Sequence, residues 1–193
     1  MIADNKGISG STISNVTGRN PMCSRYSDMN NKAVIIGAMG GTNDFRQNVT
    51  LGTIADTTNE TFYGALKILA QGLYDKYYIN QDTSAGQNKK IFFMTPLKCL
   101  QSSSAEVGGN GVNYDMSSFC KAIKDVAEMY SFPVLDLYNL SNLNPALSQT
   151  IEGTETGYTG NYNPYMTDGT HPTQEGQELI AKIVTGFIKE IYN

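Results

Sequence analysis

Three short apolar segments have the composition of buried β-strands. The first, KAVIIGA at residues 32–38, is rich in β-branched residues and runs into glycines. KKIFFMTP at residues 89–96 and FPVLDLY at residues 132–138 have the same character, and the last is entered through a proline. Continuous apolar runs of this kind are typical of strands buried on both faces of a parallel sheet. The pattern therefore predicts three such strands.

Amphipathic stretches follow each of these segments. In each stretch apolar residues recur at spacings of three and four, which predicts a helix with one buried face. The three apolar stripes consist of Phe62, Leu66, Leu69, Leu73 and Tyr77; of Phe119, Ile123, Val126 and Tyr130; and of Leu179, Ile180, Ile183, Val184, Phe187 and Ile191. Alternating strands and helices predict an α/β fold in which helices cover both faces of a parallel sheet. Ligands bind such folds at the carboxyl ends of the strands, so chemistry is expected in the loops there.

Length, charge and cysteine content restrict the class of protein. A chain of 193 residues without a low-complexity linker fits one domain, residues 1–193. The formal net charge is −4 and the basic residues are scattered, so no nucleic-acid partner is expected. The three cysteines, Cys23, Cys99 and Cys120, lie far apart and form no Cys-x-x-Cys pair, so we expect buried thiols and no metal site.

The hydropathy of the chain indicates no membrane segment. No apolar run approaches the roughly 20 residues that span a bilayer. The start MIADNKGISG lacks the basic and apolar regions of a signal peptide. We therefore expect a soluble chain that is cytoplasmic by default, although a segment ahead of Met1 could carry a signal.

Two polar stretches are candidates for binding negative charge. In NKGISGST, residues 5–12, the backbone N–H of Gly10 could point at a ligand oxygen; the alternative is an ordinary tight turn. In GAMGGTNDF, residues 37–45, Asn43 follows the first strand and could donate a hydrogen bond at the carboxyl edge of the sheet. The alternative there is that Asn43 and Asp44 cap the next segment.

A third candidate contains the only histidine of the chain. In DGTHPTQEG, residues 168–176, Asp168 precedes His171 by three residues, a spacing at which the two side chains can form a hydrogen bond. Asp168 could then orient the imidazole as a general base. The alternative is a surface histidine before Pro172, with Thr173 capping the last helix.

Together, and in this order along the chain, NKGISGST, GGTND and DGTHP resemble three sequence blocks of the SGNH hydrolase superfamily, also called GDSL esterases and lipases. The resemblance implies a flavodoxin-like three-layer α/β/α domain. It also implies that Gly10 and Asn43 form an oxyanion hole, that His171 is the catalytic base and that Asp168 orients it. The family needs no metal or organic cofactor, so none is expected.

The family's remaining block, Gly-Asp-Ser after the first strand, has no counterpart in this chain. Ser9 and Ser11 flank Gly10 but belong to a different block, so neither takes the role of the nucleophile. We therefore expect a sheet that lacks its first strand and a chain that is inactive alone, because loss of the nucleophile removes nearly all of a triad's effect. Unpaired strand edges could also support an oligomer.

The function implied is that of a serine esterase acting on a carboxylic ester, such as an acetylated carbohydrate or a small acyl ester. Tyr158, Tyr162 and Tyr165 lie in a long Asn- and Gly-rich stretch before the Asp168 pair and could stack on a sugar ring; packing against their own domain is the alternative. Two other functions stay open. One is a non-catalytic binding module that retains the cleft, and the other is a flavin or nucleotide binder with the same fold, which would leave the DGTHP and GGTND segments unexplained.

Overall fold

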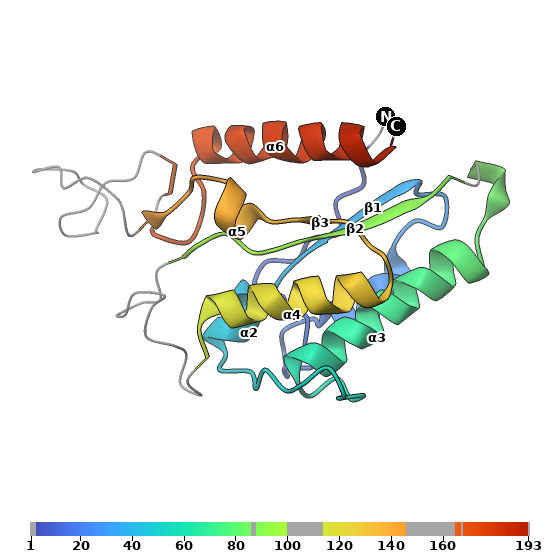
Figure 1. Cartoon of the computed structure of the whole chain (residues 1–193), viewed down its shortest axis with the longest axis horizontal. Coiled ribbons are helices and arrows are strands. Elements are labelled where there is room, and N and C mark those ends of the chain that lie inside the picture. The colour runs from blue at the N-terminus through green and yellow to red at the C-terminus, as the bar shows by residue number, and fades with distance from the viewer. Residues whose placement is uncertain (1–2, 86–87, 100–113, 146–164, 167, 193) are drawn as a thin grey trace, which may run out of the picture.

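The computed structural model describes residues 3–85, 88–99, 114–145, 165–166 and 168–192. In Figure 1 the long helices α3 and α4 lie on one face of the sheet and α6 lies on the other, which confirms the predicted three-layer α/β/α fold. The elements in chain order are α1 Met22–Arg25, η1 Tyr26–Asp28, β1 Ile35–Met39, α2 Thr42–Arg46, α3 Phe62–Tyr74, η2 Asp75–Ile79, η3 Thr83–Ala85, β2 Lys90–Met94, α4 Met116–Met129, β3 Val134–Leu135, α5 Leu137–Leu140 and α6 Gln174–Tyr192.

The strands form a parallel sheet, as predicted, and their order in the sheet is β1, β2, β3. β3 is much shorter than the predicted strand at residues 132–138. Its backbone leaves the sheet at Asp136. From there, hydrogen bonds of side chains take the place of those between strands, and Thr95 Oγ1 donates to Asp136 Oδ1 at 3.1 Å. The same hydroxyl oxygen accepts from the Tyr138 N–H at 2.9 Å. These bonds stabilise the turn from β3 into α5, so the second half of the predicted strand forms the start of a helix.

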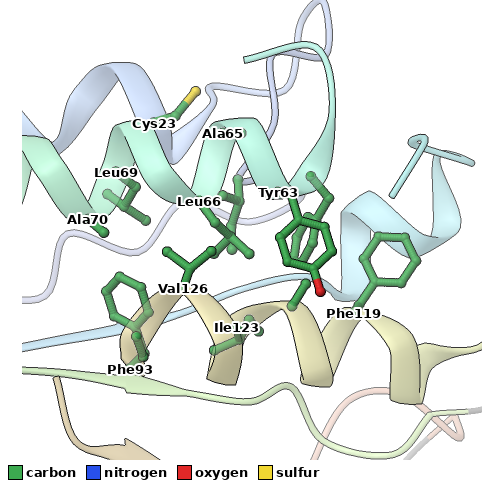
Figure 2. Packing of buried hydrophobic residues seen from close by; sticks show 14 of the residues in the cluster. Cys23, Tyr63, Ala65, Leu66, Leu69, Ala70, Phe93, Phe119, Ile123 and Val126 are labelled. Carbon is green, nitrogen blue, oxygen red and sulfur yellow. The ribbon is translucent and has the colours of Figure 1, made fainter. Parts of the chain in front are cut away.

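The larger hydrophobic core lies between the sheet and the pair α3 and α4 (Figure 2). Leu66 and Leu69 of α3 face Ile123 and Val126 of α4, and Phe93 of β2 closes the layer from the sheet side. All five side chains are buried. The helical stripes predicted from the sequence are therefore the surfaces that pack here.

A smaller core lies under α6. It consists of buried residues of the loops, β3 and α5, among them Leu97, Leu135 and Leu137, with the apolar stripe of α6 packed against them. The ring centroids of Phe92 and Phe187 are 5.5 Å apart, which ties β2 to α6. Gly176 is nevertheless the only fully buried residue of this helix of 19 residues. One face of α6 is thus only half covered.

The prediction that the first strand is buried on both faces is wrong for β1. Ile36 is its only fully buried residue, whereas Gly37 and Met39 are exposed. β1 pairs with β2 along one edge, and no strand of the described residues pairs with its other edge. The α6 side chains pack on β2 and β3, so within the part of the chain that the structure describes β1 has one neighbouring strand and is only partly covered. The apolar composition of residues 32–38 therefore overestimates how deeply β1 is buried.

Two helical glycines allow a matched test of this packing. A Cβ at Gly64 in α3 would lie 1.9 Å from the carbonyl oxygen of Thr58, whereas a Cβ at Gly186 in α6 would meet no atom within 4 Å. Because alanine favours helix by about 1 kcal/mol over glycine, we expect Gly186→Ala to raise the free energy of unfolding by up to about 1 kcal/mol. Gly64→Ala should instead lower it by about 1 to 3 kcal/mol, because the backbone must move.

Urea denaturation of the two variants measures both effects. Equal stabilisation by Gly64→Ala and Gly186→Ala would contradict the close approach of α3 to the Thr58 backbone.

Candidate active site

The glycine loop, residues 5–12, ends in a tight turn. The Ser11 N–H donates to the Ile8 carbonyl at 3.1 Å, and Gly10 has a φ of +74°, a conformation that favours glycine. The Ser11 hydroxyl donates to the Asn20 carbonyl at 2.7 Å and accepts from Arg25 Nη2 at 2.9 Å. The backbone of this loop is therefore fixed on both sides of Gly10.

The buried carboxylate of Asp44 fastens the residues that follow the glycine loop. Asp44 is fully buried in α2; its Oδ2 accepts from the Ile13 N–H and its Oδ1 from the Ser14 N–H, each at 2.8 Å. Burial raises the pKa of Asp44, and the two backbone donors act in the opposite direction. The carboxyl group of Asp44 thus connects α2 to two peptide groups that lie about 30 residues earlier in the chain.

Asn43 precedes Asp44 and touches the glycine loop directly. Its Nδ2 donates to the Ser11 carbonyl at 3.0 Å. Gly41, with a φ of +114°, provides the sharp turn between the end of β1 and the start of α2. Asn43 therefore lies at the carboxyl end of β1, as the sequence predicts, and next to the loop that contains Gly10.

A pocket of about 240 Å³ lies where these segments meet. Its walls come from the glycine loop through Ser11, from Arg25, from the β1 to α2 turn through Asn43, and from Pro96 after β2. It opens at the carboxyl ends of β1 and β2, where parallel sheets bind ligands. An apolar pocket beside the core is lined by Leu66 and Ile123 among others and has room for only about 10 Å³, so it is a packing gap.

Asp168 and His171 form the predicted pair. His171 Nδ1 lies 2.7 Å from Asp168 Oδ2, while Asp168 Oδ1 accepts from the backbone N–H groups of Thr170 at 2.9 Å and His171 at 2.8 Å. Partial burial disfavours the charged carboxylate, but these hydrogen bonds outweigh it and lower the pKa of Asp168. The His171 side chain is 70% exposed, so the loop backbone and Asp168 hold the ring more than packing does.

Two backbone contacts close the loop that contains this pair. Met166 and Pro172 form an antiparallel bridge, and the Thr173 N–H donates to the Tyr165 carbonyl at 2.9 Å. Gly176, in the first turn of α6, has no room for a Cβ, which would lie 2.3 Å from the same carbonyl oxygen. The start of α6 therefore packs closely on the residues that precede Asp168.

The pair's loop is connected to α2. Arg46, the last residue of α2, donates from Nη2 to the hydroxyl of Thr170, which lies between Asp168 and His171. Asn43 and Arg46 are three residues apart on this helix, about 4.5 Å along its axis. One short helix thus contacts both the glycine loop and the loop of Asp168 and His171.

The pattern of residue types did not reveal Asp44 and Arg46 as contacts between these segments. The sequence places Asp44 next to Asn43, which fits a simple cap, and gives no sign of partners 30 or 124 residues away. Tyr158 and Tyr162 lie outside the described residues. Tyr165 is 40% exposed and contacts the loop through its backbone.

The three cysteines are buried, as expected, and form no disulfide. Among the described residues no three His, Cys, Asp or Glu side chains cluster as a metal site would require. None of the helices in the described residues has the length and apolar content needed to cross a membrane.

One family model and several solved structures match this chain. The model of the family described as GDSL-like Lipase/Acylhydrolase matches residues 2–184. A comparison with curated proteins gave no match. A solved structure from Lactobacillus plantarum is 28% identical with a TM-score of 0.76, over 97% of this chain and 80% of the other.

More distant structures share the fold. A carbohydrate acetylesterase family member from Sinorhizobium meliloti is 14% identical with a TM-score of 0.56, over 95% of this chain and 76% of the other. An alpha/beta hydrolase enzyme from the metagenome of Lake Arreo is 18% identical with a TM-score of 0.56, over 94% of this chain and 70% of the other. The family match covers nearly the whole chain and includes the glycine loop, α2 and the Asp168 pair: the chain belongs to the GDSL-like lipase/acylhydrolase family.

Proposed function

We propose that this chain carries the acid, base and oxyanion donors of a serine esterase that hydrolyses carboxylic esters. One observation carries the proposal: α2, which bears Asn43, is hydrogen-bonded both to the Gly10 loop and to the loop of Asp168 and His171. Membership of an acylhydrolase family supports ester hydrolysis as the reaction class.

The Asp168 pair has the geometry of a general base and its orienting acid. Asp168 Oδ2 binds Nδ1 of the imidazole at 2.7 Å, so Nε2 is the nitrogen that takes a proton from the nucleophile and returns it to the leaving alcohol. The lowered pKa of Asp168 keeps the carboxylate charged at neutral pH, where it stabilises the imidazolium that forms.

Asn43 is positioned to stabilise the tetrahedral oxyanion. Its amide has two N–H donors, and one of them binds the Ser11 carbonyl. That bond fixes the orientation of the amide, and because Asn43 lines the pocket, the second N–H can serve a substrate oxygen there. The Gly10 N–H, in a turn of fixed geometry, is the second proposed donor.

We propose that the nucleophile comes from outside residues 1–193, on a strand that pairs with the open edge of β1. The sequence has no Gly-Asp-Ser, and the Ser11 hydroxyl is engaged with Asn20 and Arg25. A strand beside β1 would cover Gly37 and Met39, and its carboxyl end would meet the pocket beside Asn43.

An acetylated sugar is the proposed substrate class. Tyr165 is exposed just before the Asp168 pair, where an aromatic ring can stack on a pyranose face. The carbohydrate acetylesterase family member from Sinorhizobium meliloti shares the fold. Small acyl esters would fit the same chemistry, so a comparison of acetylated xylose with an aryl acetate decides between the two.

The proposed external nucleophile is tested by turnover. Residues 1–193 alone should hydrolyse p-nitrophenyl acetate at the background rate. The chain extended upstream by a strand and a Gly-Asp-Ser segment should melt at a higher temperature and hydrolyse this ester. Because members of a triad act as a unit, His171→Ala should lower kcat of the extended form by about 10³-fold or more.

The matched control replaces the serine of the added segment by alanine. Turnover by the unextended chain, with a serine-directed phosphonate attached to one of its own serines, would contradict an external nucleophile. A stabilised but inactive extended chain would favour the binding module instead.

The charge of Asp168 predicts a pH dependence of stability. Because the folded-state pKa of Asp168 is lowered, its stabilising contribution is present above the unfolded value of about 3.9 and is lost as pH falls through the folded value. The free energy of unfolding of the wild type should exceed that of Asp168→Asn at pH 5, and the difference should shrink as pH falls below about 3.9 and through the lowered folded-state pKa of Asp168. The difference at pH 5 should be at most about 1 kcal/mol, because water screens this half-exposed side chain.

Urea denaturation at several pH values measures this difference. A gap that stays constant from pH 5 to pH 3 would show that Asp168 stabilises the loop without its charge.

A further inference from the structure

We infer that Arg46 is a positioning residue of the active site. It holds the loop of Asp168 and His171 in a fixed position relative to α2, the helix that bears Asn43. The inference rests on the proposed function for its catalytic meaning. The contact itself is structural: the Arg46 guanidinium binds the Thr170 hydroxyl across 124 residues of sequence.

Thr170 transmits this contact to the catalytic pair. Its side chain accepts from Arg46, while its backbone N–H donates to Asp168 Oδ1 at 2.9 Å. The same Asp168 oxygen accepts the His171 N–H, and the other oxygen binds the imidazole. The position of α2 therefore reaches the His171 ring through Thr170 and Asp168.

The exposure of the ring makes such a restraint necessary. With 70% of its side chain in solvent, His171 has little packing to define where it lies relative to Asn43. Nε of Arg46, by contrast, is inaccessible to solvent, so the base of the guanidinium is enclosed and its direction is restricted. A planar, pre-organised donor of this kind fixes geometry better than a flexible ammonium group.

α2 also fixes the other side of the pocket. Asp44 binds the backbone of Ile13 and Ser14 after the glycine loop, and Asn43 binds Ser11. Because Arg46 belongs to the same five-residue helix, the oxyanion donors and the base share one rigid reference. Arg46 thus sets the distance between the base and the site where negative charge develops.

The experiment uses the only histidine of the chain as its probe. The ring proton and nitrogen signals of His171 are recorded by NMR for the unextended wild type and for Arg46→Met, Thr170→Val and Thr170→Ser. Thr170→Ser keeps the hydroxyl and is the matched control.

We expect Arg46→Met and Thr170→Val to move the His171 ring signals toward those of a histidine in an unstructured peptide. The signals of Thr170→Ser should match the wild type. Arg46→Lys should resemble Arg46→Met, because an ammonium group lacks the planar fork. The double variant with Arg46→Met and Thr170→Val should shift the His171 signals no further than either single variant, because both substitutions remove the same hydrogen bond.

Wild-type His171 signals in both Arg46→Met and Thr170→Val would overturn the inference, as would a change in Thr170→Ser as large as that in Thr170→Val. In the extended, nucleophile-bearing form, Arg46→Met should lower kcat by about 10- to 100-fold with KM nearly unchanged, because misplacement of a catalytic group by about 1 Å has effects of this size. If the extended form has no activity at all, the proposed function fails while the NMR result still decides the role of Arg46.

Discussion

The geometry of the site depends on the hydrogen bonds that the buried carboxyl group of Asp44 accepts from the backbone of Ile13 and Ser14. Burial of a carboxyl group without hydrogen bonds is unfavourable, and the bonds from two peptide groups satisfy both of its oxygens. The same bonds satisfy two backbone donors that would otherwise be buried without partners. Neither side can separate from the other without exposing an unsatisfied polar group, so the residues after the glycine loop and α2 behave as one unit.

The hydrophobic pattern predicted the layers of the fold because it reports which face of a segment is buried. It did so well for α3 and α4, whose stripes pack against each other and against Phe93. It failed at Asp136, where hydrogen bonds between side chains and backbone end β3 inside an apolar run. It also overstated the burial of β1, since burial depends on the neighbouring strand and not on the strand's own composition.

The candidate site was predictable where the chemistry is carried by rare residue types in fixed spacing. A single histidine three residues after an aspartate, or an asparagine after a strand and two glycines, is visible in the sequence. Asp44 and Arg46 were not recognised because their roles come from partners far away in the chain. Only the tertiary structure brings Thr170 beside the end of α2, and no local periodicity encodes that approach.

The uneven division of the hydrophobic core has a consequence for inactivation. The larger core, between the sheet and α3 and α4, contains the elements that support α2, whereas α6 rests on a much smaller set of buried side chains. Regions with few buried contacts open at lower free energy than the whole domain. His171 lies three residues before the start of α6, so partial detachment of this helix would move the proposed base relative to Asn43 while most of the fold persists. Loss of the proposed catalytic arrangement is then a local event, and the melting of the domain as a whole is a poor measure of how long the candidate site survives.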